Sequence, residues 1–190
     1  DVPLAGGVSC ATRKGRVLLW RESATEPAAV LVDAAGVAAC AWAPDGRYCA
    51  VLGRTGLLHV LADDLAPVVA ASTAVRTRLG WDASACVARA AVSWRGDSEC
   101  FAVAVAASTA TTAPEDDAQL VVVDRLGRAE AVCAVPSDVA LLGVAHAWRP
   151  AGEVVAALGA TRDARAAPVL LLFERAGFLR HRVPLATPHP

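Results

Sequence analysis

Four histidines are the first side chains to consider for metal binding or proton transfer. They are His59, His146, His181 and His189. Their spacing contains no HxH, no HExxH and no pair four residues apart, the arrangements that bring two imidazoles to one metal ion. The sequence therefore predicts no zinc or iron site. His146 stands two residues before a tryptophan, and we interpret it as a structural, hydrogen-bonding histidine.

The cysteines are a second possible source of chemistry. No two of them form a CxxC pair, which a zinc knuckle would need. We therefore expect buried, reduced thiols of an intracellular protein. The six are Cys10, Cys40, Cys49, Cys86, Cys100 and Cys133.

Motifs for nucleophiles and nucleotides are missing as well, since the sequence has no GxSxG and no GxxxxGK[ST]. We interpret the acidic run Glu115-Asp116-Asp117 as a solvated loop rather than a cation site. Arg95-Gly96-Asp97 resembles an adhesion tripeptide, but we interpret it as a turn in which the glycine supplies backbone freedom. The sequence thus predicts no catalytic, metal-binding or cofactor-binding residue, and no cofactor.

Composition excludes further classes of function. The chain has 190 residues, is 55% hydrophobic, has a mean hydropathy of +0.43 and carries a formal net charge of −1. A membrane-spanning helix needs roughly 20 apolar residues in a row, and the apolar runs here are much shorter. The near-neutral charge disfavours direct binding of nucleic acid, which needs a strongly positive surface. The sequence has no methionine, which suggests a fragment or a processed chain.

One pattern occurs three times along the chain: a run of small residues, a tryptophan and a turn. The tryptophans are 52 and 54 residues apart. A blade of a WD40 or kelch propeller takes about 40–50 residues, so this period fits a four-stranded blade with one long loop. We interpret the tryptophans as packing residues between blades. The structural landmarks of the repeat are Trp42, Trp94, Trp148, Gly46, Gly96 and Gly152.

Short β-branched runs bounded by Gly, Pro and Asp follow each turn and indicate strands. No segment combines a helical apolar stripe with clear caps. The sequence therefore predicts an all-β fold, a partial WD40-like β-propeller of about three complete four-stranded blades and part of a preceding one. Residues 1–190 would form it, with blades at about 1–34 (incomplete), 35–75, 88–136 and 139–186. Propellers close with about 4–8 blades, so further blades are expected on a parent protein.

Several of these segments also match specific motifs. Residues 92–103 resemble x-W-R-G-D-G-x-x-F-A-V, and residues 147–156 resemble A-W-x-P-S-G-x-L-I-A. Residues 170–185 resemble V-x-F-F-E-x-N-G-L-x-H-x-x-F-x-L. Residues 42–45 and 79–81 resemble W-S-P-D and V-G-W-G. In the order in which they occur along the chain, these five motifs resemble those of Elongator complex protein 1, the IKAP family. The departures are Ser98 for a glycine, Ala176 for a turn asparagine and the loop from Ser108 to Ala118.

The resemblance implies a role. The family is the largest, scaffolding subunit of Elongator, a complex that modifies the wobble uridine of certain tRNAs, while the radical and acetyl-CoA chemistry sits in another subunit. The chain would be a non-catalytic segment of its first WD40 propeller, and its partners would be other Elongator subunits. Contact with tRNA would be indirect, no membrane would be involved, and the parent would dimerise through regions outside this chain. The expected location is the cytoplasm, with the nucleus as a second place.

The sequence is also compatible with a second hypothesis about the class of protein. The chain could belong to an unrelated WD40-type adaptor, or to a propeller enzyme with its active site in the central channel. Such enzymes line the channel with several charged or histidine side chains at the inner strand ends. The inner strands expected here carry mostly Ala, Val, Cys and Ser, which disfavours the enzyme.

Overall fold

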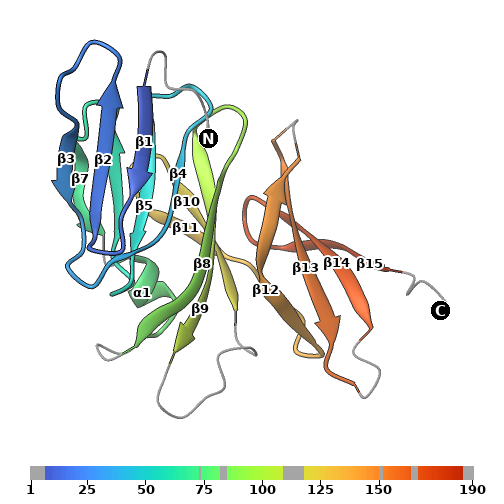
Figure 1. Cartoon of the computed structure of the whole chain (residues 1–190). Helices are drawn as coiled ribbons and strands as arrows, with labels where there is room; N and C mark the ends of the chain where they lie inside the picture. The colour runs from blue at the N-terminus through green and yellow to red at the C-terminus, as the bar shows by residue number, and fades with distance from the viewer. Residues whose placement is uncertain are drawn as a thin grey trace, which may run out of the picture.

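The structure, a computed structural model, describes residues 7–72, 74–81, 85–108, 118–149, 152–163 and 167–185. Four antiparallel sheets follow one another along the chain (Figure 1), and each is a meander of strands adjacent in sequence. The first has three strands and the other three have four. The expected all-β propeller class is confirmed.

The first sheet consists of β1 (Gly7–Ala11), β2 (Arg16–Arg21) and β3 (Ala28–Leu31). The second consists of β4 (Val37–Trp42), β5 (Tyr48–Gly53), β6 (Leu58–Ala62) and β7 (Pro67–Ser72). The third consists of β8 (Cys86–Trp94), β9 (Cys100–Ser108), β10 (Gln119–Asp124) and β11 (Ala129–Val132). The fourth consists of β12 (Val139–Trp148), β13 (Val154–Thr161), β14 (Pro168–Glu174) and β15 (Leu179–Pro184).

Aspartates hold the turns between the third and fourth strands of the second and third sheets. The Asp124 carboxylate accepts hydrogen bonds from the backbone N–H groups of Leu126 (2.9 Å) and Arg128 (2.8 Å). Gly127 then takes the left-handed conformation that closes the turn, with φ +79°. In the corresponding turn of the second sheet, Asp64 stands two places further on and accepts one hydrogen bond, from the N–H of Ala66 (2.8 Å).

The core consists of three apolar clusters, each between two successive sheets. Strand β10 shows the principle, because its side chains alternate between two clusters. Val121 and Val123 belong to the cluster shared with the second sheet, whereas Leu120 and Val122 belong to the one shared with the fourth. A strand covered on both faces can be apolar throughout, which explains the unbroken hydrophobic third strands.

One helix departs from the pattern expected from the sequence. α1 spans Ala74–Arg78 in the connection between the second and third sheets. Its Val75 is 1% exposed, and the Val75 carbonyl accepts the N–H of Leu79 at 3.0 Å. A single buried side chain therefore holds one helical turn, too short for a periodic stripe to reveal. No helix among the described residues is long and apolar enough to cross a membrane.

Candidate functional site

The interfaces between sheets hold the three repeat tryptophans. Each is at least nine-tenths buried at the end of its first strand. The indole N–H of Trp94 donates to the Ala41 carbonyl at 2.9 Å, and that of Trp148 donates to the Ser93 carbonyl at 2.9 Å. In both cases the acceptor is the residue just before the preceding tryptophan. The first strands β4, β8 and β12 lie against one another, so the tryptophans occupy corresponding places in successive sheets.

Trp42 makes the corresponding bond differently. Its indole N–H donates to the hydroxyl of Ser9 at 2.7 Å. Ser9 is on β1, the edge strand of the three-stranded sheet. In the described part of that sheet, no strand precedes β1 in the position that β4, β8 and β12 hold in the other sheets. A side-chain oxygen therefore accepts the bond in place of a backbone carbonyl.

The turn after each first strand needs one residue in the left-handed conformation. Gly46, Ser98 and Gly152 hold that place, with φ of +72°, +63° and +88°. Gly96 is not in this conformation, so Ser98 corresponds to the two glycines and the backbone freedom assigned to Gly96 is a wrong prediction. Ser98 is 4% exposed, and its hydroxyl accepts the N–H of Asp45 from the neighbouring turn at 3.2 Å. This bond between turns is a use for serine that glycine could not provide.

An ion pair also bridges the third and fourth sheets. The Arg175 guanidinium donates to both carboxylate oxygens of Glu130, at 2.7 and 2.5 Å. This bidentate contact lowers the pKa of Glu130 below its ordinary value. Arg182 bonds in addition to Asp138, which lies in the connection between the two sheets (2.5 Å).

A buried carboxylate joins the first and second sheets. Asp33, 7% exposed, follows β3 and accepts the Ala35 N–H (2.8 Å), the Thr55 N–H (2.9 Å) and the Thr55 hydroxyl (2.7 Å). Burial raises the pKa of Asp33, but these hydrogen bonds outweigh it and leave the pKa below the ordinary value. A Cβ on Gly53 would lie 2.1 Å from the Asp33 carboxylate, so the carboxylate requires glycine there.

The three described histidines, His59, His146 and His181, lie on different strands. Both ring nitrogens of His146 lie near carbonyl oxygens, of Val144 (2.9 Å) and of Ala102 (3.1 Å), as its structural interpretation requires. His59 is half-buried, and burial lowers its pKa. His181 is exposed on β15, and His189 lies outside the described residues. No group of three metal-ligating side chains occurs among the residues that the structure describes.

The cysteines divide into two groups. Cys49, Cys100 and Cys133 are buried as expected, but Cys10, Cys40 and Cys86 are exposed, so the expectation is wrong for these three. Cys10 is on β1, an edge strand of the first sheet, and Cys86 is the first residue of β8. Burial raises the pKa of Cys133 to about 12 and that of Cys100 to about 11, so neither supplies a thiolate near neutral pH.

The first strands of the sheets test the alternative hypothesis of a propeller enzyme with its active site in the central channel. Along β4, β8 and β12, the charged or histidine side chains are Arg89 and His146. They stand on different strands, and His146 is engaged by carbonyls. These strands therefore present no converging set of acids, bases and cations. The acidic run Glu115-Asp116-Asp117 lies outside the described residues.

The molecule is a series of antiparallel sheets whose first strands lie side by side, and a buried tryptophan packs at each interface between them. This arrangement defines a β-propeller. Residues 82–188 match the family described as ELP1 first N-terminal beta-propeller, and the chain belongs to this family.

Solved structures give a second comparison. The chain is similar to the crystal structure of Chaetomium thermophilum Sqt1, with 21% identity and a TM-score of 0.62 over 93% of this chain and 43% of that one. At this identity the likeness shows the fold alone, and the chain spans less than half of that structure. No curated protein matches the sequence.

Proposed function

We propose that this chain is a non-catalytic scaffold segment of the largest subunit of Elongator, and that it supports wobble-uridine modification of tRNA by positioning partner subunits. The observation that carries the proposal is membership of the ELP1 propeller family across residues 82–188. The inner strands support it, because they offer no group of side chains suited to catalysis. Residues 1–190 would be a partial propeller, with blades near 1–34, 35–75, 88–136 and 139–186.

The mechanism is positional. Apolar clusters, indole bonds and the Arg175–Glu130 pair fix neighbouring sheets in one register. A rigid series of sheets keeps its loops at constant separations, which is what a docking surface for several proteins needs. We propose that the partners are other Elongator subunits, that tRNA contact is indirect, and that the parent dimerises elsewhere. The proposed location is the cytoplasm, with the nucleus second.

The test is affinity purification of the tagged full-length protein from its native cells, with partners identified by mass spectrometry. Recovery of the other Elongator subunits is expected. A Trp94→Ala variant, which opens an interface between sheets, should recover less of them, whereas Phe178→Ala at an exposed turn should recover as much as the wild type. Purification of the wild-type protein without any Elongator subunit would overturn the proposal.

A further inference from the structure

Charged side chains are separated between the two ends of the first two sheets. Four segments at one end together carry six cations and one acid; they are residues 12–16, 32–36, 54–56 and 74–81. Three segments at the other end carry one cation and five acids; they are residues 22–27, 43–47 and 63–66. The net charge of −1 therefore does not reveal that the two ends have opposite sign.

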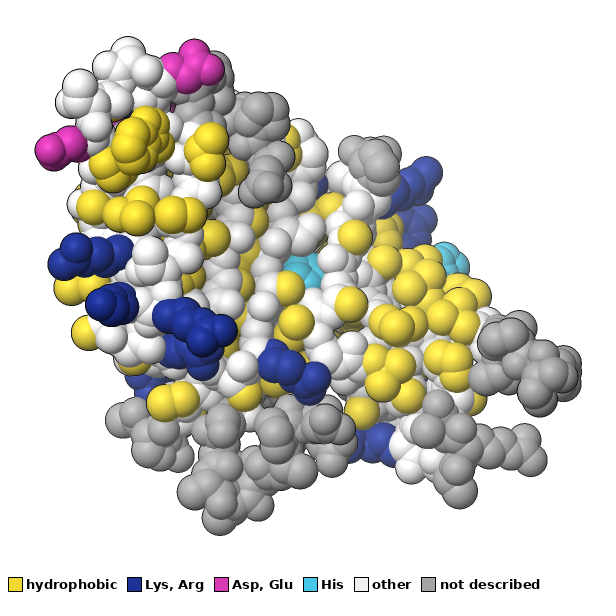
Figure 2. Space-filling model, in the orientation of Figure 1, with side chains coloured by type: hydrophobic (Ala, Val, Ile, Leu, Met, Phe, Trp, Pro, Cys, Tyr) yellow, Lys and Arg dark blue, Asp and Glu magenta, His cyan; other side chains and the backbone are white. Residues whose placement is uncertain are grey.

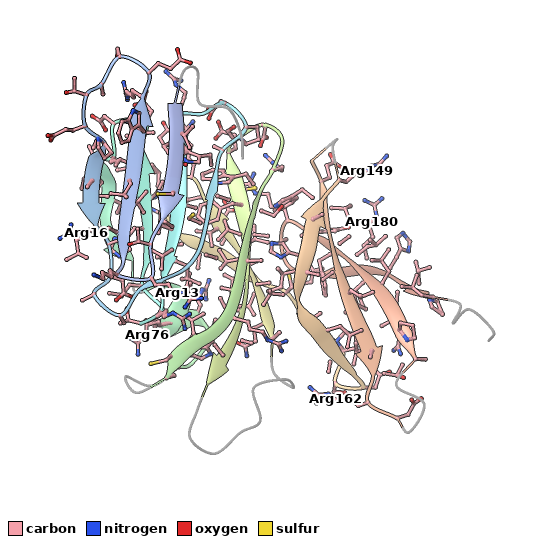
Figure 3. All side chains as sticks on the ribbon, in the orientation of Figure 1. Arg13, Arg16, Arg76, Arg149, Arg162 and Arg180 are labelled. Carbon is pink, nitrogen blue, oxygen red and sulfur yellow. The ribbon has the colours of Figure 1, made fainter. Side chains whose placement is uncertain are left out.

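The cations gather although they come from segments far apart in the sequence. Figure 3 shows Arg13, Arg16 and Arg76 at the same end of the first sheets. Figure 2 shows Lys and Arg side chains along this part of the surface, with acidic side chains at the opposite end. We call this surface the basic end, and it consists of Arg13, Lys14, Arg16, Arg54, Arg76 and Arg78.

Backbone contacts between the turns place these arginines. The N–H of Arg54 donates to the Gly36 carbonyl at 2.9 Å, and the Arg54 carbonyl accepts the N–H of Val87 at 2.8 Å. A Cβ on Gly36 would lie 2.8 Å from the Arg13 carbonyl and 3.3 Å from Cδ of Arg54. Arg13 and Arg54, 41 residues apart, therefore both lie against the bare backbone of Gly36.

Arg76 is placed by a second glycine in the same manner. A Cβ on Gly56 would lie 2.9 Å from Cγ of Arg76, so the arginine side chain lies directly over the β5–β6 turn. Gly36 and Gly56 both have positive φ, +114° and +80°. Each of the two turns thus has glycine at the point where an arginine from another segment crosses it.

Acidic side chains do not neutralise this surface. Arg13, Lys14, Arg54 and Arg78 are exposed, and within the described part of the chain no ion pair or side-chain hydrogen bond engages them. Asp33, the acid of this end, is buried, and its carboxylate already accepts three hydrogen bonds. The cations therefore repel one another, and a bound anion would relieve that repulsion.

The basic end fits a short acidic protein segment better than a nucleic acid. Single-stranded nucleic acid is held largely by exposed aromatic side chains on which its bases stack. Trp81, the aromatic residue in these segments, packs instead against the core cluster between the second and third sheets. A long polyanion would also extend over the rest of the chain, which carries a net negative charge. A short segment avoids that repulsion, and arginine can form two parallel hydrogen bonds to one carboxylate.

We propose that the basic end binds a short segment rich in Asp and Glu from a partner protein. The guanidinium groups of Arg13, Arg54 and Arg78 pair with its carboxylates, and Lys14 adds positive charge. The surface lies at the ends of the sheets, which stay open when sheets pack face to face. This refines the proposed scaffold role by giving the chemistry of one partner, and it rests on that role only in that the partner is a protein.

The test follows the fluorescence anisotropy of a labelled peptide of alternating Glu and Ser as the 190-residue chain is added. This peptide should bind, whereas a Gln–Ser peptide of the same length should bind roughly tenfold more weakly or less. Raising the salt concentration from about 0.1 M to about 0.5 M should weaken binding of the Glu–Ser peptide severalfold, because the pairs are exposed.

Charge reversal locates the site. Arg13→Glu combined with Arg54→Glu should weaken binding of the Glu–Ser peptide roughly tenfold or more. The matched control is Arg47→Glu combined with Arg128→Glu, which changes the net charge equally at exposed turns of the opposite end and should change binding less than about twofold. Arg13→Gln combined with Arg54→Gln should give an intermediate loss. Unchanged urea midpoints would show that all three double variants are folded.

Equal binding of the Glu–Ser and Gln–Ser peptides would overturn the proposal, and so would equal losses in the two charge-reversed variants. Tighter binding of an oligouridine of the same charge would identify a nucleic-acid surface instead. Self-association of the chain that Arg13→Glu with Arg54→Glu abolishes would identify the acidic end of a second copy as the occupant. A failed purification of Elongator subunits would leave this inference standing, and a failure of the peptide to bind would leave the scaffold role standing.

Discussion

The interface between the third and fourth sheets and the interface between the first and second are built differently. Among the described residues, the former has a cluster of sixteen buried apolar residues and the latter has eight. In the former, Trp148 bonds to a backbone carbonyl, whereas in the latter Trp42 bonds to a serine hydroxyl. The smaller interface also contains the buried Asp33 carboxylate, which accepts hydrogen bonds from the N–H and the hydroxyl of Thr55. The comparison teaches what the first strand of a sheet contributes to the interface with the following sheet. It supplies apolar surface, and its backbone carbonyl accepts the indole N–H of the next tryptophan.

The largest effect is expected for Trp148→Ala. It removes a large buried side chain and leaves the Ser93 carbonyl without its partner. We expect the free energy of unfolding to fall by about 3–5 kcal/mol, measured by urea denaturation. Phe178→Ala, at a side chain 68% exposed, is the control and should change it by less than about 0.5 kcal/mol. Equal effects of the two changes would contradict the packing role of the tryptophan.

Asp33→Ala should come next. It leaves the N–H and hydroxyl of Thr55 and the N–H of Ala35 without their acceptor, at a cost of about 2–3 kcal/mol. Because the folded pKa of Asp33 lies below the ordinary 3.8, its stabilisation is complete above that value. It is lost as pH falls through the lower, folded pKa. Denaturation midpoints from pH 7 to pH 2 should therefore drop less steeply in Asp33→Asn than in the wild type.

Two conservative changes isolate the indole bonds. Trp148→Phe leaves the Ser93 carbonyl without its partner at a buried interface and should cost about 1–3 kcal/mol. Trp42→Phe should cost less than about 1 kcal/mol, because the hydroxyl of half-buried Ser9 can rotate toward water. Urea titrations of both variants side by side measure the difference. Equal losses would remove the contrast between the two interfaces.

The smallest effect is expected for the Arg175–Glu130 pair. Its side chains are 43% and 29% exposed, so solvent screens the attraction. A double-mutant cycle with Arg175→Ala and Glu130→Ala should give a coupling of about 0.5–1 kcal/mol that shrinks in 1 M salt. If salt did not change the coupling free energy, the two side chains would be held together by packing or hydrogen bonding rather than by the attraction of their charges.

The strands and the tryptophan repeat could be predicted because they leave a periodic trace. Apolar runs, turn residues and a spacing near 50 are visible without any contact information. The helix α1 could not be predicted, because its single buried valine does not produce the repeated apolar spacing that marks a helix in a sequence. The roles of Ser98 and of Asp33 were hidden for a related reason. Their partners, Asp45 and Thr55, stand 53 and 22 residues away, and spacing along the chain does not mark such pairs.

Charge pairs across sheets were equally invisible. Glu130 and Arg175 are 45 residues apart and belong to different repeats, and the second sheet has the apolar Val68 where the third has Glu130. Exposure of Cys10 follows from its place on an edge strand of the three-stranded sheet, which composition does not record. Comparison of repeats in register, residue by residue, is the signal that could have found the cross-sheet pair.

The apolar clusters also have a thermodynamic consequence. Each sheet contacts chiefly its sequence neighbours, so the molecule is a linear stack in which cohesion is a sum of nearest-neighbour contributions. Such a stack loses order from its ends inward, one sheet at a time. The central strands of the second and third sheets, β5, β6, β9 and β10, have a sheet on either side and would be the last to open.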